Sequence, residues 1–257
     1  MSTIEASGQH RRTGPFPWAS VIWSLTAAGL LLSSAVLQHI AAIQRWVVFN
    51  GSRGPTELSV EDHLFDYNFP TDAWVSVGTA AQVYGTGTLI QALGVLAMAF
   101  GVLALPGAAS RRRVVFAIME IVIALLVAAW LGLNGAHALV SGIIGTPSPL
   151  QHWWALDWIG VAGLVALGVL WWRRSWAAMI ACAFLLGSSL MGYYFVASLM
   201  ITPLITGYIS HDTTPWTETV VATWTALAGV AMLLAAWAAT RGGVRPDCPA
   251  QTASVLQ

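Results

Sequence analysis

Six long stretches of mostly apolar residues dominate the sequence, and they restrict its fold more than any other feature. They cover residues 18–43, 74–105, 114–140, 150–172, 176–201 and 216–240. A helix needs about 20 apolar residues to cross the hydrocarbon core of a bilayer. Unbroken apolar runs lack the alternating pattern of a membrane β-barrel. The sequence therefore predicts an all-α, polytopic bundle of six transmembrane helices.

The composition agrees with this prediction. Only 9% of the residues are charged and 57% are hydrophobic, whereas soluble globular domains carry about 25% charged residues. The first apolar stretch is too long for the apolar region of a signal peptide, so we expect it to be retained as a span. The predicted organisation is an N-terminal segment at 1–17, a transmembrane domain at 18–240 with a longer loop at about 44–73, and a disordered tail at 241–257.

The placement of arginine predicts the orientation of the bundle. The chain has no lysine, a bias that fits a GC-rich genome, and all eleven basic residues are arginine. With six spans, nine arginines fall on one side, and only Arg45 and Arg53 fall on the other. Positive residues concentrate in cytoplasmic loops. We therefore expect both termini in the cytoplasm, the 44–73 loop outside, and a location in the plasma membrane of a bacterium.

Capping residues predict where the helices that run inward begin. Pro149 suits the first position of the fourth helix, with Ser148 as its N-cap. Thr71 is the corresponding cap of the second helix. Thr214 precedes the sixth helix, and Glu218 lies in its first turns, where a negative charge complements the helix dipole.

Two carboxylates fall inside the predicted spans. Asp157 follows Pro149 by eight residues, which places it about 12 Å along a helix that begins there. Glu120 follows Arg113 by seven residues, or about 10 Å. Ionisable groups at such depth usually face the bundle interior or water. Each is a candidate for a proton, cation or substrate pathway, and the alternative is a carboxyl group paired with a neighbouring helix.

Small residues cluster in two of the spans. The sequences "YGTGT" (Tyr84 to Thr88) and "GSSLMGYY" (Gly187 to Tyr194) carry glycine and serine at helical spacing. Small residues let transmembrane helices approach closely. The alternative is a local break that lines a path, as in discontinuous transporter helices. Tyr193 and Tyr194 are then candidates for contact with a substrate.

Histidines gather on the outer side and raise a metal hypothesis. Histidines on adjacent helices can bind a b-type haem or copper. The spacing contains no HxxxH or HExxH motif, so hydrogen-bonded packing residues are the alternative, and the sequence identifies no cofactor. The candidate ligands are His39, His137, His152, His211 and Asp212.

Three functions fit these features, and we expect first a permease-type subunit that moves a small molecule or lipid. The sequence contains no Walker, dinucleotide-binding, GxSxG or nucleic-acid-binding motif, so a separate protein would supply the energy. Span number and chain size are similar to those of six-span permease subunits of ATP-driven exporters. The short loop with Arg111, Arg112 and Arg113 is the expected contact for such a partner, and the same arginines can touch lipid headgroups.

The two alternatives belong to different classes. One is a redox subunit with haem or copper near the outer leaflet. The other is a structural or assembly subunit that binds its partner through the acidic 44–73 loop. We expect either a partner subunit or a homo-oligomer. Nucleic acid is not an expected partner.

Overall fold

Every regular element in the described part of the chain is helical, as the sequence predicts. The computed structural model describes residues 18–49, 60–105, 111–153, 155–210 and 212–242. The principal helices are α1 (Trp18–Ile43), α2 (Ala80–Leu103), α3 (Arg111–Ile144), α4 (Leu156–Trp171), α5 (Trp176–Leu185) and α7 (Thr217–Gly242). Shorter helical segments are η1 (Gln44–Val48), η2 (His63–Phe65), η3 (Pro149–Trp153), η4 (Leu186–Ser188), η5 (Gly192–Ile201) and α6 (Thr202–Thr206).

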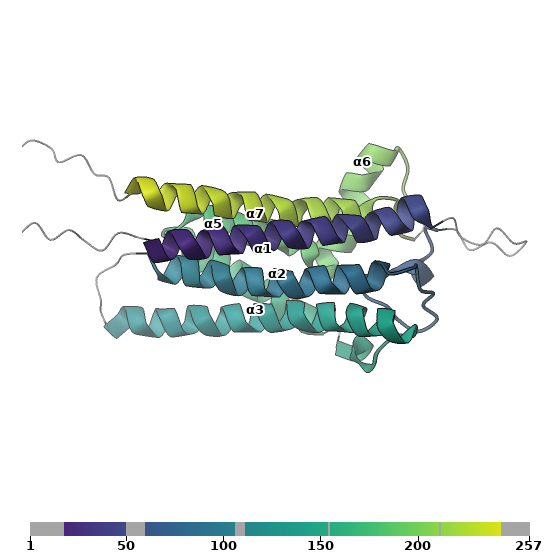
Figure 1. Cartoon of the computed structure of the whole chain (residues 1–257), viewed down its shortest axis with the longest axis horizontal. Coiled ribbons are helices and arrows are strands. Elements are labelled where there is room, and N and C mark those ends of the chain that lie inside the picture. Colours follow the sequence, from purple (N-terminus) through teal and green to yellow (C-terminus); the bar gives the residue numbers. More distant parts are fainter. Residues whose placement is uncertain (1–17, 50–59, 106–110, 154, 211, 243–257) are drawn as a thin grey trace, which may run out of the picture.

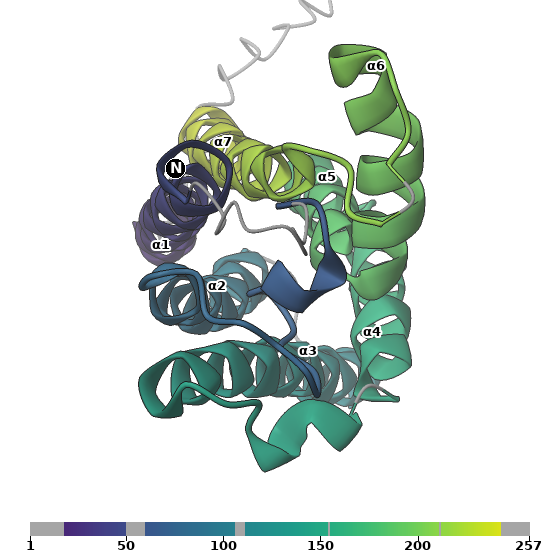
Figure 2. The same cartoon turned by 90° about the vertical axis from the view of Figure 1, so that its right-hand side faces the viewer.

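The six principal helices form a closed ring. Each helix contacts the next in the order α1, α2, α3, α4, α5 and α7, and α7 returns to contact α1. Figure 1 shows the long helices running side by side, and Figure 2 shows the ring from one end. Residues 60–79, which contain η2, lie over this end between α2 and α5 (Figure 2). We call residues 60–79 the loop segment, and the end of the ring that they cover the loop end.

Four helices are long and apolar enough to cross a membrane. They are Trp18–Val48, Ala80–Leu103, Val114–Ile144 and Thr217–Arg241. A fifth candidate span consists of Trp176–Ser188 and Gly192–Thr206, which meet at a bend of 85°. The remaining principal helix, α4, has only 16 residues. The described residues therefore give four to five candidate spans, and the six-span threading and its orientation stay predictions.

The outer surface of the ring is apolar along its length. Leu93, Leu125, Val169, Val230 and Trp237 come from four different helices and are all well exposed. A surface of this kind is unfavourable in water but suits contact with lipid tails. The helices are therefore compatible with insertion into a membrane.

The second helix begins later than the sequence predicts. We expected it from residue 74 with Thr71 as its cap, but α2 begins at Ala80. Trp74 and Val77 instead pack with Phe65 and Tyr67 in a small buried cluster at the loop end. Gly78 follows with a φ of +50°, a conformation that glycine adopts readily and that a helix excludes.

The fourth helix also begins later than predicted. Pro149 opens the separate short helix η3, and α4 begins at Leu156. The hydroxyl of Ser148 accepts a hydrogen bond from the Leu150 N–H at 3.4 Å, so its capping acts on η3. The prediction for the last helix is correct, because α7 begins at Thr217 with Glu218 in its first turn.

Helices α2 and α3 touch through glycine. A Cβ atom added to Gly85 would lie 2.5 Å from the Gly135 carbonyl oxygen, and one added to Gly135 would lie 2.8 Å from the Gly85 carbonyl oxygen. No side chain fits there, so the two backbones are in direct contact. This confirms the close-packing interpretation of the Tyr84–Thr88 stretch.

The apolar core fills the ring from its middle toward the end opposite the loop. Leu31, Met98, Leu167, Trp171 and Met232 are all fully buried members of one cluster. The half of the ring nearer the loop end has a different interior, because polar side chains gather there.

Candidate functional site

The break in the fifth candidate span lies where the sequence places the "GSSLMGYY" stretch. Ser189 has extended backbone dihedrals, and it separates η4 from η5. Gly187 and Gly192 permit the sharp bend. A Cβ atom on Gly192 would lie 2.4 Å from the Leu186 carbonyl oxygen, and one on Gly187 would lie 1.7 Å from the Trp224 ring. The stretch therefore serves both close packing and a break, which the sequence presented as alternatives.

Asp157 lies directly opposite this break. Both of its carboxylate oxygens lie 3.2 Å from the backbone nitrogen of Leu190, which donates to them. The residue is in the first turn of α4, not about 12 Å along a helix that starts at Pro149. The predicted helix start is wrong because residues 149–153 form the separate helix η3, and the depth of Asp157 in a membrane stays a prediction. Asp157 is nevertheless buried, with 8% of its surface exposed.

A small cavity of about 30 Å³ lies beside Asp157 and the break. Its lining comes from the ring helices, the broken span and the loop segment together. The lining residues are Asn68, Phe69, Tyr84, Asn134, Asp157, Ser188, Ser189, Leu190, Tyr193 and Val221. Such a volume exceeds the roughly 10–15 Å³ that one water requires. The cavity is therefore a polar space inside the ring, and residues of the loop segment form part of its wall.

One polar group in the cavity wall has no partner. The side-chain oxygen of Asn68 is buried and makes no hydrogen bond within the described part of the chain. Buried polar atoms in folded proteins nearly always have a partner, in the protein or in bound solvent. The oxygen of Asn68 is therefore a buried acceptor without a donor, on a residue that lines the cavity.

A layer of polar side chains crosses the ring next to the cavity. The amide of Gln38 on α1 donates to Gln91 on α2 at 2.8 Å, and Gln91 donates to Ser188 at 2.9 Å. Thr225 on α7 donates to Gln38 at 3.3 Å. Within a membrane, hydrogen bonds of this kind hold helices together. They also connect the cavity to the middle of the ring.

A buried ionic group fastens the loop segment to the ring. Arg45, in η1, has no exposed surface and donates to Asp66 at 2.5 Å and to Glu218 at 2.7 Å. Trp46 donates its indole N–H to Glu218 at 2.7 Å, and Thr213 donates to Asp66 at 2.9 Å. The loop segment, the end of α1 and the start of α7 therefore meet at one guanidinium.

The carboxyl group of Asp66 lies in an unusual environment. Burial raises the pKa of Asp66 to about 6, against the opposing charge of Arg45 and the hydrogen bond from Thr213. Glu218 adds to the increase because it shares the same guanidinium. Two carboxylates and one guanidinium leave this group with an excess of negative charge when both acids are ionised.

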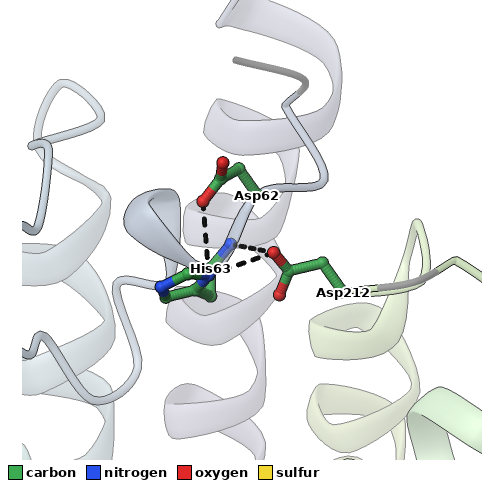
Figure 3. A group of neighbouring side chains, drawn as sticks. All are labelled: Asp62, His63 and Asp212. Atoms are coloured by element: carbon green, nitrogen blue, oxygen red, sulfur yellow. Dashed lines mark hydrogen bonds and ion pairs between the residues drawn. The ribbon is translucent and has the colours of Figure 1, made fainter.

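A second polar cluster lies on the surface of the loop end. Figure 3 shows His63 between Asp62 and Asp212, with its Nδ1 atom 3.0 Å from Asp212 and 3.3 Å from Asp62. It is the one group of three metal-ligating side chains within reach of a common ion in the described residues. The hydrogen bond with Asp212 raises the pKa of His63. The cluster can hold a proton and offers three ligands to a divalent ion.

The other residues predicted as site candidates lie apart from the cavity, except Tyr193. Tyr193 lines the cavity and donates to Glu218 at 3.2 Å, whereas Tyr194 is exposed. Glu120 is buried and accepts a hydrogen bond from Arg174 at 2.9 Å. This ion pair gives Glu120 a structural partner at a distance from the break.

The predicted histidine ligands do not come together among the described residues. Both ring nitrogens of His137 are engaged, Nδ1 with Ser148 at 2.7 Å and Nε2 with the Pro70 carbonyl at 2.8 Å. His39 is partly buried on α1, and His152 is exposed on η3. His211 lies outside the described residues, as do the side chains of Arg111, Arg112 and Arg113.

Sequence reasoning missed the central members of the site. Arg45 was noted only as an arginine on the unexpected side, although that departure from the charge bias was itself a signal. Asn68, Gln38 and Gln91 carry no motif, and only the ring brings them together. Gln38 and Gln91 could have been marked as polar residues within apolar spans.

Comparison with known proteins gives no similarity from which to infer function: no family model, curated protein or solved structure matches the chain. The inference of function therefore rests on the site alone.

Proposed function

We propose that the chain is a permease-type membrane subunit that moves a small polar solute through the centre of the six-helix ring. The observation that carries this proposal is the break in the fifth candidate span beside a polar cavity inside the ring. Discontinuous helices in transporters place backbone groups and polar side chains at the substrate or coupling-ion site.

The distribution of polar groups supports a pathway that is closed in this conformation. The loop segment, fastened through Arg45 and Asp66, covers one end of the ring. The cavity and the Gln38–Gln91 layer lie beneath it, and the apolar cluster around Leu31 and Met98 fills the rest. Because the polar interior is enclosed by helices, it favours a small solute over a lipid as cargo.

The orientation and the energy source belong to the same proposal. With six spans and both termini in the cytoplasm, the loop end faces outward, so the cavity is reached from outside. The chain has no nucleotide-binding motif. A separate energy-supplying subunit would bind the cytoplasmic end, where α3 begins with Arg111, Arg112 and Arg113.

Cysteine accessibility tests the proposed pathway. In a background with Cys182→Ala and Cys248→Ser, Ser188→Cys places a thiol in the cavity wall. Ala181→Cys is the matched control, because Ala181 lies in the same broken span but in the apolar core. A membrane-impermeant thiosulfonate should label Ser188→Cys from outside when the pathway opens during transport, and should leave Ala181→Cys unlabelled. If Ser188→Cys resists labelling from both sides as Ala181→Cys does, the ring holds no pathway.

Haem or copper binding near the outer leaflet remains the alternative proposal. The cluster of Asp62, His63 and Asp212 favours a metal, whereas the two hydrogen bonds of His137 leave its ring without a free nitrogen for iron. An absorption spectrum and a metal analysis of the detergent-purified protein separate the two proposals. A Soret band that shifts on reduction, or stoichiometric copper, would support the alternative.

A further inference from the structure

We propose that the cavity beside Asp157 binds a dehydrated sodium ion. This inference rests on the proposed function, because it names the ion that the pathway carries or to which it couples. Four independent properties of the cavity lead to it: the chemistry of its ligands, its charge, its unsatisfied oxygen and its size.

The ligands in the cavity wall are oxygen atoms. Asp157 offers a carboxylate, Asn68 and Asn134 offer amide carbonyls, and Ser188 and Ser189 offer hydroxyl groups. No histidine or cysteine is among the lining residues. Oxygen ligands of this type suit hard cations, whereas copper and zinc prefer nitrogen and sulfur.

The charge in the cavity corresponds to one monovalent cation. Asp157 is the only carboxylate among the lining residues. In the described part of the chain, no arginine or histidine lies within ion-pair distance of it. A carboxylate buried inside a membrane protein is unfavourable without a counter-charge. The guanidinium of Arg45, which belongs to the described residues at this end of the ring, is already shared by Asp66 and Glu218.

The oxygen of Asn68 gives an independent sign of a ligand. Asn68 has only 8% of its surface exposed, lines the cavity, and leaves its side-chain oxygen without a hydrogen-bond donor. An acceptor in this position is satisfied by a cation as well as by a donor. Asn68 belongs to the loop segment, so an ion held between Asn68 and Asp157 would also link the loop segment to α4.

The size of the cavity restricts the occupant further. In this closed conformation, a volume of about 30 Å³ has room for a sodium ion with one or two waters but not for a larger solute. The break brings two helix ends to the site: the N–H of Leu190 donates to Asp157, and the carbonyl end of the preceding half-helix carries partial negative charge that suits a cation. The carbonyl end of α5 and η4 lies at Ser188, in the cavity wall.

Thermal unfolding of the full-length, detergent-purified protein tests this inference. Tryptophan fluorescence is followed while sodium chloride replaces N-methyl-D-glucamine chloride or potassium chloride at constant ionic strength and fixed pH. Sodium at about ten times its Kd should raise Tm by about 3–6 °C relative to both other salts. The measurement is repeated at several pH values in the absence of sodium.

Three variants locate the effect. Asp157→Asn should abolish the sodium-dependent rise in Tm, and Asn68→Ala should weaken it while the bond between Asp157 and Leu190 stays intact. Asn68→Ala also covers the case in which Asp157→Asn fails to fold. Asp72→Asn is the matched control, because it makes the same chemical change in an exposed carboxylate outside the cavity, and it should keep the full rise.

The possible outcomes are distinct. The inference is overturned if sodium raises the Tm of the wild type no more than N-methyl-D-glucamine does, or if Asn68→Ala and Asp157→Asn keep the full rise. It is also overturned if Tm responds through Asp157 to pH but not to sodium, since the site then takes only a proton. If the thiosulfonate labels Ser188→Cys but sodium does not raise Tm, the sodium site is wrong and the proposed pathway stands. If sodium raises Tm but the thiosulfonate does not label Ser188→Cys, the ion site stands and the proposed pathway is wrong.

Discussion

Arg45 and Glu218 are 173 positions apart in the sequence, yet the guanidinium of Arg45 donates to the carboxylate of Glu218 at 2.7 Å. The first residue follows α1 and the second opens α7, so this bond closes the ring at the loop end. Asp66 shares the same guanidinium and brings the loop segment with it. The stability of the bundle and the position of its cover therefore depend on one buried group.

Replacing Arg45 should destabilise the protein strongly. Arg45→Met leaves Asp66 and Glu218 buried without their counter-charge, a change that costs about 3–5 kcal/mol. For a chain of this size, each kcal/mol lowers Tm by about 2–4 °C. Thermal unfolding in detergent checks the size of the effect. Arg173→Met, at an exposed position, is the control and should unfold close to the wild type.

A triple variant separates the charge effect from lost packing. Arg45→Met combined with Asp66→Asn and Glu218→Gln removes the unpaired charges, and the two amides keep the shapes of the carboxyl groups that they replace. It should regain part of the lost Tm, because well-packed neutral replacements of buried ion groups are often tolerated. Equal Tm values for Arg45→Met and Arg173→Met would show that the buried group contributes nothing to stability.

The contact between α2 and α3 predicts that replacing a glycine by alanine affects stability differently at two helical positions. Gly85→Ala forces a Cβ atom into the backbone of α3 and should cost about 1–3 kcal/mol. Gly132→Ala, on α3, meets nothing within 4 Å, so it should be neutral or slightly stabilising because alanine has the higher helix propensity. Unfolding temperatures of the two variants test this. A Gly85→Ala protein as stable as Gly132→Ala would mean that the helices are farther apart.

The hydrogen bond between His63 and Asp212 predicts a local pH dependence. Because this bond raises the pKa of His63, the interaction stabilises the loop end fully below the unfolded pKa of about 6.5. The stabilisation is lost as the pH rises through the higher, folded pKa. NMR titration of labelled histidine should show the raised pKa in the wild type and a lower one in Asp212→Asn.

Repeating the NMR titration of His63 at high salt provides a second test. His63 is well exposed, so added salt should screen the charges of Asp62 and Asp212 and lower the pKa of His63 toward its ordinary value. If the pKa of His63 is unchanged in Asp212→Asn, the contact between His63 and Asp212 in Figure 3 would be wrong.

Much of the fold could be predicted, because the length of each apolar stretch determines whether it forms a long apolar helix. The helices expected at 18–43, 114–140 and 216–240 appear within a few residues of those bounds. The starts of α2 and α4 were predicted wrongly, because Trp74 and Val77 pack in the buried cluster at the loop end and residues 149–153 form the separate helix η3. Hydropathy does not distinguish a membrane span from a buried loop.

The candidate site was less predictable. Asp157 and Tyr193 were marked from their chemistry and their place in a span, and the structure puts both in the wall of one cavity. Asn68 could not be found in this way, since its role depends on how the loop segment folds back into the ring. Glu120 was marked by the same rule as Asp157, but its ion pair with Arg174 explains it. A buried carboxylate becomes informative only when its partners are known.

The last prediction concerns α4, on which the six-span threading depends. Its 16 residues give a length of about 24 Å, less than the roughly 30 Å of the hydrocarbon core. Trp158 and Trp172 are exposed near its two ends, and tryptophans in such positions anchor a short span at both interfaces.

We therefore expect α4 to cross the membrane despite its length. Alkaline phosphatase, which is active only after export, should be active when fused after Gly145, between α3 and η3, and inactive when fused after Arg174, between α4 and α5. A fusion after Gly242 should also be inactive, since α5 and α7 then return the chain to the cytoplasm. Equal activity after Gly145 and Arg174 would show that α4 does not span and would overturn the six-span threading.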